Sequence, residues 1–201
     1  MYQKIKRVGD VVLSIFALIA LSPLLAICML LIYLEDGGNP IFKQKRIGEN
    51  GKPFMFYKLR TMRVNAENER KSAIIKNKNE SDGPVFKIKD DPRITKVGKF
   101  LRKASIDELP QLINVLKNEM SIVGPRPALP CEVECYTDYQ RQRLMCKPGL
   151  TCYWQTTPNR NDVLFDDWVE MDLRYIKNKS IKEDLLIILR TFKIIFTLDS
   201  R

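Results

Sequence analysis

The chain carries an uncharged stretch, VVLSIFALIALSPLLAICMLLIYL, from Val11 to Leu34. Because about 20 apolar residues span the hydrocarbon core of a bilayer, this stretch predicts a membrane helix. Ser22 and Pro23 stand at its midpoint, and a proline inside a helix removes one backbone hydrogen bond and crowds the preceding turn. We therefore expect a kink there, with the Ser22 hydroxyl bonded back to a freed carbonyl.

Basic side chains stand on both sides of this apolar segment. They are Lys4, Lys6 and Arg7 before it, and Lys43, Lys45, Arg46, Lys52, Lys58 and Arg60 after it. A single crossing would place basic residues on both faces of the bilayer, against the positive-inside rule. Alternatively, each arm of about 12 residues extends about 18 Å, short of the ~30 Å core, so the segment can enter and return on one side. The residues alone leave a kinked spanning helix and a re-entrant helix both open.

The composition limits the chemistry that the chain can perform. It has 201 residues and a formal net charge of +10, which favours anionic partners. It has no histidine, and this excludes Ser-His-Asp triads, histidine acid-base catalysis and the histidine-containing zinc sites of hydrolases. Five cysteines without a C-x-x-C pair indicate a reducing compartment with packed or surface thiols. Carboxylates, Lys, Cys, Tyr and any bound metal remain as catalytic groups.

A β-hairpin is predicted between Pro40 and Met62. Asn50-Gly51 favours a tight turn, because both central residues of a type I′ turn need positive φ. Aromatic residues are interspersed with lysines and arginines on either side of this turn. The pattern fits either a ribbon that faces phosphate groups or a solvated edge strand protected by its lysines.

Further helices are expected along the chain. The polar residues from Val64 to Asn79 indicate a surface helix that frays into a loop, and the run Asp90–Ser105 indicates a turn followed by a short basic helix. Near the C-terminus, Ser180 and Glu183 match a capping box. The following residues, Leu185–Phe196, are almost wholly apolar with cationic interruptions, which fits a helix at a membrane interface or a core helix.

Two adjacent carboxylates stand in SIDELPQLINVLKNEMS, Ser105–Ser121, at the start of a predicted helix. Ser105 and Glu108 match a capping box, and Asp107 suits the positive end of a helix dipole. Alternatively, one of the two carboxylates is a nucleophile. On a helix the two point about 100° apart, so they need not share one role. Arg102 precedes the pair at a place where it could clamp an anion.

Two proline-containing loops follow. In the run Gly124–Pro127, two prolines restrict the backbone around Arg126. This either holds the guanidinium for a phosphate or nucleobase edge or simply makes a rigid turn. The loop Cys146–Asp162 is polar and carries Trp154, and such loops form either a binding rim or plain surface.

The order of these motifs resembles the bacterial sugar transferases, the monotopic phosphoglycosyl transferases that start glycan assembly on a polyprenol carrier. The matching pieces are the apolar segment with Ser22-Pro23, YKLRTM (Tyr57–Met62), DPRIT, LRKASIDELPQLINVLKNEMSIVGPRP, KPGLT, Gln155 and MDLRYIKNKSIKEDLLIILRT. Together they cover nearly the whole chain. The run from Arg102 to Pro127 is the specific part of the resemblance.

The resemblance implies an α/β fold, namely a compact, mostly helical, membrane-associated domain with a β-hairpin and interfacial amphipathic helices. Residues 1–36 would form a re-entrant membrane helix, and residues 37–201 a cytosol-facing catalytic domain that ends in an interfacial helix. The implied location is the cytoplasmic face of the bacterial inner membrane.

The implied activity is transfer of a sugar 1-phosphate from a UDP-sugar to undecaprenyl phosphate, with release of UMP and use of Mg²⁺. In that family the aspartate of the Asp-Glu pair is the nucleophile. Asp107 would therefore form an acyl-phosphate bearing the sugar, and the carrier phosphate would attack it. Asp107 and Glu108 are also the candidate metal ligands.

The resemblance also implies a set of residues that bind substrate. They are Lys58, Arg60, Arg102, Pro125, Arg126, Pro127, Gln155, Arg160 and Asp172. The cations among them can offset the repulsion between an ionised aspartate and a diphosphate. The expected partners are a UDP-sugar, undecaprenyl phosphate and membrane lipid; nucleic acid is not expected, and a homodimer is left open.

Two positions depart from the family pattern, since Cys152 and Asn159 stand where glycine is common. They alter a loop expected near the nucleotide or sugar, and so bear on sugar identity more than on the chemistry. Trp154-Gln155 resembles members that transfer hexose 1-phosphates such as galactose or glucose. The rival hypotheses are a non-catalytic, membrane-anchored basic adaptor for acidic lipid or nucleic acid, and a transferase that works without a covalent intermediate.

Overall fold

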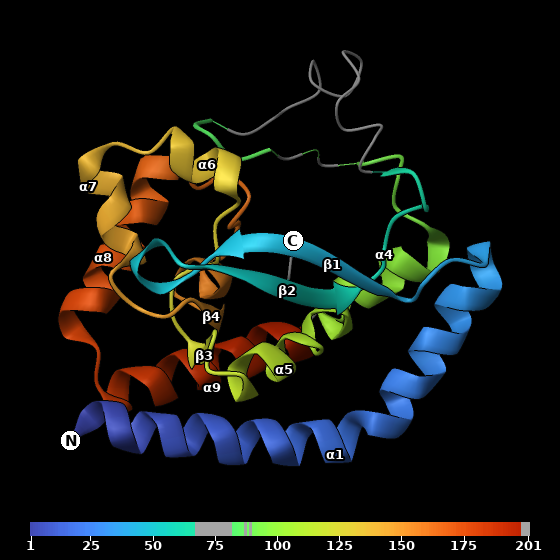
Figure 1. Cartoon of the computed structure of the whole chain (residues 1–201), viewed down its shortest axis with the longest axis horizontal. Helices are drawn as coiled ribbons and strands as arrows, with labels where there is room; N and C mark the ends of the chain where they lie inside the picture. Colours follow the sequence, from blue (N-terminus) through green and yellow to red (C-terminus); the bar gives the residue numbers. More distant parts are fainter. Residues whose placement is uncertain (67–81, 87, 89, 198–201) are drawn as a thin grey trace.

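The computed structural model describes residues 1–66, 82–86, 88 and 90–197. They form a mixed fold of helices and short strands that is mostly helical, as the sequence predicts. A twisted hairpin lies in the middle of the molecule, and two long helices, α1 and α9, run along one side of it (Figure 1). The hairpin and the short helices around it position the candidate site.

The N-terminal helix α1 (Tyr2–Asp36) is continuous but bent, and its second part turns away from the direction of the first (Figure 1). Pro23 lies inside this helix, and the Ser22 hydroxyl donates to the carbonyl of Ile19 at 2.8 Å. The predicted kink and its hydroxyl bond are therefore confirmed. Within the described part of the chain, α1 is the one helix that is long and apolar enough to cross a membrane.

The first arm of α1 turns polar side chains toward the domain and apolar side chains outward. Asp10 is buried and accepts hydrogen bonds from the Ser121 hydroxyl at 2.7 Å and from the backbone N–H of Ile122 at 3.2 Å. On the outer face, Phe16 and Ile19 are 71% and 70% exposed. This distribution is the reverse of a water-facing surface helix.

Both ends of α1 bond to the same domain. Near its start, Arg7 donates to the last two carbonyls of α5 (Gln111–Leu116), at 2.6 and 2.9 Å. Near its end, the carboxylate of Glu35 accepts from the first backbone N–H of α4 (Lys96–Lys103) at 2.8 Å. Gly37 then ends the helix in a left-handed conformation, with φ 70°. Both arms of α1 therefore contact the same domain.

The predicted hairpin is confirmed. Strands β1 (Ile41–Ile47) and β2 (Pro53–Leu59) pair antiparallel along their whole length. Asn50 and Gly51 have φ of 55° and 76°, the positive values that the turn sequence requires. Pairing stops at the strand ends and the loop contains a short 3-10 turn, η1 (Glu49–Gly51), so the connection is longer than a two-residue turn.

The segment after α4 does not begin as the sequence predicts. A single 3-10 turn, η2 (Ile106–Glu108), comes first, and α5 starts only after Pro110. Ser105 has a left-handed backbone, with φ 55°, rather than the extended one that an N-cap needs, and its side chain caps nothing. The predicted capping box of Ser105 with Glu108 is therefore wrong, and Glu108 is available for another role.

The side chain of Asn114 fastens α5 to the outer edge of β2. Its amide donates to the carbonyl of Met55 at 2.7 Å, and its oxygen accepts from the N–H of Tyr57 at 3.2 Å. Asn114 is fully buried, and Glu119 accepts its remaining N–H at 2.7 Å. Because a buried amide is costly when unpaired, these bonds fix α5 and the preceding η2 against one register of β2.

A second, parallel strand pair was not predicted. It joins β3 (Ser121–Val123) to β4 (Gly149–Thr151), in a region where the sequence indicates loops. A Cβ added to Gly149 would lie 2.1 Å from the backbone nitrogen of Gly124, so the two chains approach at a distance that only glycine permits. The sequence does not predict this pairing, because the two strands are distant in the chain.

The other elements of the second half are short helices and two longer ones that pack against the strands. They are α6 (Pro130–Glu134), α7 (Asp138–Arg141), η3 (Gln142–Leu144), η4 (Trp154–Thr156), α8 (Phe165–Asn178) and α9 (Ile181–Thr197). The Ser180 half of the capping box predicted for α9 is confirmed, since the Ser180 hydroxyl accepts from the N–H of Glu183 at 3.2 Å, whereas the Glu183 carboxylate accepts from the Tyr153 hydroxyl. The basic helix is confirmed as α4, whereas the helix predicted over Val64–Asn79 falls mostly outside the described residues.

Candidate active site

The acidic dyad, Asp107 and Glu108, lies on η2 between α4 and β2. Asp107 is buried, with 8% of its surface exposed. Glu108 is partly buried, and its carboxylate accepts a hydrogen bond from the side-chain amide of Gln155 at 3.2 Å. Gln155 belongs to η4, so the tertiary fold brings two separate sequence motifs into contact.

Four predicted cations gather around this dyad from four segments of the chain. Lys58 comes from β2, Arg102 from α4, Arg126 from the loop after β3, and Arg160 from the loop after η4. The charges of Arg126, Arg160 and Lys58 act on the carboxyl group of Glu108, and that of Arg102 acts on Lys58. The structure therefore joins these residues into one electrostatic unit.

The pKa values of the site reflect burial and crowding of charge. Burial raises the pKa of Glu108, and the negative charge of Asp107 raises it further, against the opposing cations. Burial lowers the pKa of Lys58 to about 8, and the positive charge of Arg102 contributes, while Asp107 opposes the shift. The cluster thus holds two carboxylates close together and two cations close together. A bound phosphate would reduce the repulsion between the cations, and a bound metal cation would reduce the repulsion between the carboxylates.

Two of the cations are held in place by neighbouring side chains. The Nε of Arg102 donates to the hydroxyl of Thr61 at 2.9 Å, and the ammonium of Lys58 lies 5.1 Å from the ring centre of Phe42. The close packing of α4 on this region depends on Gly98, because a Cβ there would lie 2.1 Å from the carbonyl oxygen of Thr61.

The Pro-Arg-Pro segment is fastened on both sides of its arginine. The carbonyl of Pro125 accepts from the N–H of Gly149 at 2.8 Å, and the carbonyl of Pro127 accepts from Arg46 at 2.9 Å. The segment is therefore a turn whose backbone is fixed on both sides of Arg126. Substrate contacts of Pro125 and Pro127 stay predictions.

The loop after η4 is internally bonded. The indole N–H of Trp154 donates to the carbonyl of Arg160 at 2.9 Å. Asn159 has φ 50°, a left-handed value that asparagine tolerates and glycine adopts freely, so this departure from the family pattern preserves the backbone. Cys152 is buried and lies in the core rather than on the loop surface.

Two predicted binding residues are engaged in ion pairs. Arg60 pairs with Asp36 at the end of α1. Asp172 pairs with Arg143 at 2.5 Å, and both side chains are almost completely buried. Burial raises the pKa of Asp172 to about 6, and the charge of Arg143 opposes this shift. A substrate contact for either residue stays a prediction.

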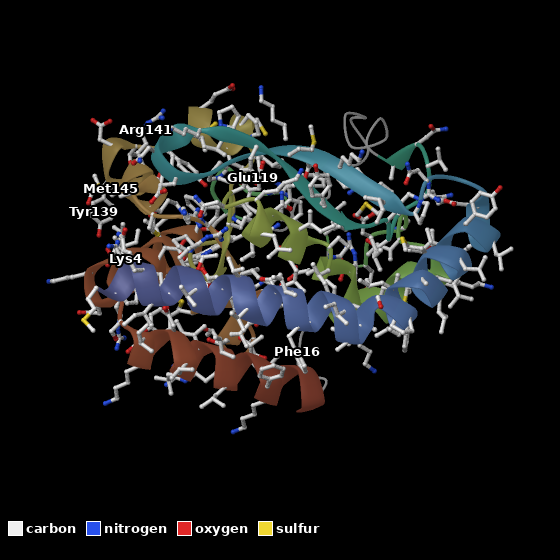
Figure 2. The ribbon with its side chains drawn as sticks, turned by 60° about the horizontal axis from the view of Figure 1, so that its bottom comes forward. Lys4, Phe16, Glu119, Tyr139, Arg141 and Met145 are labelled. Carbon is white, nitrogen blue, oxygen red and sulfur yellow. The ribbon has the colours of Figure 1, made fainter. Side chains whose placement is uncertain are left out.

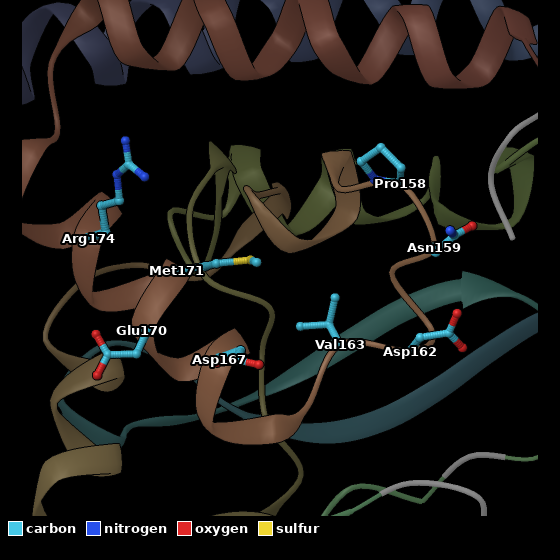
Figure 3. A pocket seen from close by; sticks show the side chains of 8 residues that line it. All are labelled: Pro158, Asn159, Asp162, Val163, Asp167, Glu170, Met171 and Arg174. Atoms are coloured by element: carbon cyan, nitrogen blue, oxygen red, sulfur yellow. The ribbon is translucent and has the colours of Figure 1, made fainter.

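Two hollows adjoin the site. One lies between the hairpin and the segments 61–66 and 85–86, and Lys58, Arg60 and Arg126 share its wall with Arg46 and Arg93. The other is drawn in Figure 3 and lies between α8 and the preceding loop. It is lined by Pro158, Asn159, Asp162, Val163, Asp167, Glu170, Met171 and Arg174. The basic hollow, rather than the acidic one, suits a diphosphate.

Sequence reasoning missed several residues that build the site. One is Thr61, whose hydroxyl accepts from Arg102, because a lone threonine carries no sequence signal. Arg46 was seen only as one of the basic residues of the hairpin, yet its guanidinium supports Pro127. Lys58 and Arg46 of the hairpin line the wall of the basic hollow, and a ribbon that faces phosphate groups stays a prediction.

The donor set at the dyad suits a shared Mg²⁺ better than a fully enclosed one. In the described part of the chain, no group of three Asp, Glu, Cys or His side chains could hold a metal by itself. Mg²⁺ is, however, commonly bound by one or two carboxylates together with substrate phosphates and water. The mutual repulsion that raises the pKa of Glu108 is the kind that a divalent cation offsets.

Comparison with known proteins identifies the family of this chain. The sequence pattern of the family described as bacterial sugar transferase matches residues 1–198. Galactosyl transferase CpsE of Streptococcus agalactiae is 46% identical over 94% of this chain and 42% of its own length. Undecaprenyl-phosphate galactose phosphotransferase of Salmonella typhimurium is 44% identical over 97% of this chain and 41% of its own. Exopolysaccharide production protein ExoY of Sinorhizobium fredii is 44% identical over 92% and 83%.

The chain belongs to the bacterial sugar transferase family. It spans about two fifths of the length of the first two relatives, which are 42% and 41% covered, and most of the third. The resemblance drawn from the motifs is therefore confirmed at the level of the family.

Replacing Asp172 with Asn should destabilise the protein by about 3 kcal/mol or more, because removal of one partner leaves the buried Arg143 charge uncompensated. Thermal unfolding of the purified protein in detergent measures this loss. Asp138→Asn is the matched control, since Asp138 is exposed on α7 and should leave the melting temperature unchanged. An Asp172→Asn protein that melts like the wild type but loses activity would contradict the structural role.

Proposed function

We propose that this chain is a phosphoglycosyl transferase that moves a sugar 1-phosphate from a UDP-sugar to undecaprenyl phosphate. The observation that carries the proposal is the buried Asp107 beside Glu108, enclosed by Lys58, Arg126 and Arg160. The names of the relatives support both the lipid carrier and a hexose, and one of them is a UDP-galactose-lipid carrier transferase of Erwinia amylovora. Galactose is accordingly the first sugar to test.

In the first step, a carboxylate oxygen of Asp107 attacks the phosphorus that bears the sugar. The bond between that phosphorus and the oxygen bridging to the uridine-bearing phosphate breaks, and UMP leaves with the bridging oxygen. An aspartate is ionised at neutral pH and therefore needs no histidine to activate it. Its obstacle is repulsion by the diphosphate, which Lys58, Arg126 and Arg160 offset.

In the second step, a phosphate oxygen of undecaprenyl phosphate attacks the same phosphorus, and the bond to Asp107 breaks. The carboxylate is restored, and the product is the lipid-linked sugar diphosphate. Because nucleotide and lipid use the pocket in turn, a small domain suffices. Gln155 holds Glu108 beside the reacting carboxylate. Asp107 and Glu108 would hold Mg²⁺ together with the substrate phosphates, and the ion would supply further neutralisation of negative charge.

The placement of α1 supports a monotopic arrangement at the cytoplasmic face of the inner membrane. A straight crossing would send the two ends of α1 to opposite faces, whereas Arg7 and Glu35 bond to one domain. We propose that the kink at Pro23 lets residues 1–36 enter the bilayer and return. Residues 37–201 would then form the catalytic domain on the cytosolic side.

The face formed by α1 and α9 supports the same arrangement. Turning the molecule brings these two helices forward side by side, with Phe16 on this face (Figure 2). In α9, Leu185, Leu189 and Phe192 are exposed, whereas Ile187 is buried. A contiguous apolar surface of this kind on two helices fits the interfacial region of a membrane. Neither the family nor the relatives lend support to the adaptor hypothesis.

Mixed with UDP-galactose and Mg²⁺ but no lipid, the wild-type protein should release UMP up to about one equivalent, because each molecule forms one covalent intermediate. Asp107→Asn should abolish this burst and the sugar-phosphate adduct seen by mass spectrometry of the peptide around position 107. The control Asp138→Asn should keep both. A ternary-complex transferase would release UMP only after the carrier is added, and an adaptor would release none. Retention of the burst by Asp107→Asn would contradict the proposed nucleophile.

The pH dependence of kcat/KM should report the protonation of Lys58. Because the pKa of this residue is lowered to about 8, its positive charge is present below that pH and is lost as the pH rises through it. The value of kcat/KM should therefore decline above about pH 8. Lys58→Arg should remain active and lose this alkaline decline, since arginine keeps its charge. An identical profile in both proteins would show that another group titrates.

Accessibility labelling should place both flanks of α1 on one side of the membrane. Single cysteines are introduced at Lys4 and at Lys52, which are exposed, after replacement of the exposed Cys131 and Cys135 by serine. An impermeant maleimide should label neither position in intact cells and both after permeabilisation. Labelling of only one of them in intact cells would overturn the re-entrant arrangement in favour of a crossing.

A further inference from the structure

Two stacked indole rings lie beside Arg126. Trp154 of η4 and Trp168 of α8 have ring centres 4.2 Å apart and planes tilted by 14°. Each indole is 5% exposed. The guanidinium carbon of Arg126 lies 5.7 Å from the ring centre of Trp154 and 5.6 Å from that of Trp168. We call this ring pair the indole platform.

The guanidinium of Arg126 lies beside the indole pair, at nearly equal distances from the two ring centres, and in the described part of the chain is not held by hydrogen bonds. Among the described residues it has no hydrogen-bond acceptor, in contrast to Arg46, Arg102 and Arg143, which donate to protein oxygens. Contact with aromatic rings, unlike a hydrogen bond, leaves the N–H groups of a guanidinium available. The positive charge also reaches the dyad, because it lowers the pKa of Glu108.

The platform is supported from its far side by a buried charge. The guanidinium carbon of Arg143 lies 5.1 Å from the ring centre of Trp168 and is neutralised by Asp172. Arg143 also donates to the hydroxyl of Tyr136 at 2.9 Å. Trp168 is therefore contacted by cations from two directions, and the Asp172–Arg143 pair anchors it in the core.

We infer that the indole platform positions Arg126 for the phosphoryl transfer, so that Trp154 and Trp168 are positioning residues of this reaction. The two rings bound one side of the guanidinium, and its N–H groups are presented to an anionic phosphate at the dyad. A planar fork held in this way can donate two parallel hydrogen bonds to phosphate oxygens. The inference rests on the proposed function for the identity of its ligand.

Trp168 is the side chain that tests this inference most cleanly. Its indole N–H is buried and, among the described residues, has no hydrogen-bond partner, so replacement by Phe loses no hydrogen bond. Trp168→Phe keeps a ring face for Arg126, whereas Trp168→Leu removes it. Phe54→Leu serves as the stability control, because Phe54 is buried in a different core cluster that contains neither indole.

A double-mutant cycle separates positioning of Arg126 from general damage to the fold. The initial rate of UMP release is compared for the wild type, Trp168→Leu, Arg126→Ala and the double variant. Trp168→Leu should lower kcat/KM about tenfold in the wild-type background and less than about twofold in the Arg126→Ala background. Trp168→Phe should retain most of the activity, and Phe54→Leu should lower the melting temperature without this coupling. Equal losses in the two backgrounds would overturn the inference.

Binding of UMP gives a measurement that needs no turnover. The chain has two tryptophans, which are the two rings of the platform, so tryptophan emission reports on it alone. Titration with UMP should change this emission saturably in the wild type and in Trp168→Phe, with at least about tenfold weaker binding in Arg126→Ala. Binding with this pattern but without UMP release from UDP-sugars would sink the proposed function alone. UMP release with additive effects in the cycle would sink the inference alone, and a wild type that binds no UMP would overturn both.

Discussion

The amide of Asn114 completes the outer edge of β2 where a further strand would otherwise be needed. It bonds to the backbone of Met55 and Tyr57, which flank Phe56 in the strand. Because Asn114 is fully buried, any other register of α5 against β2 would leave its amide unpaired at a cost in free energy. Lys58, the next residue of the strand, is thereby brought to the acidic dyad. Arg7 of α1 adds to this constraint, since it caps the end of α5. Helix α5, bonded to β2 through Asn114 and to α1 through Arg7, thus connects the hairpin, the dyad and α1.

The electrostatics of the site follow from this packing. A buried aspartate beside a glutamate would be unfavourable alone, and cations from four segments compensate for it. The compensation is incomplete, because Lys58 is itself crowded by Arg102. A site in this state favours ligands that bring phosphate together with a divalent cation. The chemistry expected of an aspartate nucleophile therefore depends on the surrounding charges as much as on the carboxylate.

Helix α1 separates polar from apolar side chains. Its buried polar residues, Asp10 and Ser14, face the domain, while Phe16 and Ile19 face outward. This polarity would be unfavourable in water and is favourable where the outer face meets lipid. The same helix bonds to the domain at both ends, so its outer apolar face and the acidic dyad belong to one folded unit. A lipid-borne acceptor would reach such a site without leaving the interface.

Features that depend on local rules could be predicted from the sequence. The kink at Ser22-Pro23, the hairpin with positive φ at Asn50 and Gly51, the basic helix α4 and the cap of α9 were all predictable, because their causes lie within a few residues. The motif order also indicated the family and the residues of the dyad.

The contacts between these elements, in contrast, follow from tertiary packing and could not be predicted from the sequence. The sequence left a capping box of Glu108 with Ser105 open. The left-handed backbone of Ser105 excludes this cap, and Glu108 instead accepts a hydrogen bond from Gln155. The β3–β4 pair, the Arg143–Asp172 ion pair and the indole platform beneath Arg126 join residues far apart in the chain. Such contacts arise from packing of preformed elements, and no local propensity encodes which distant side chains will meet.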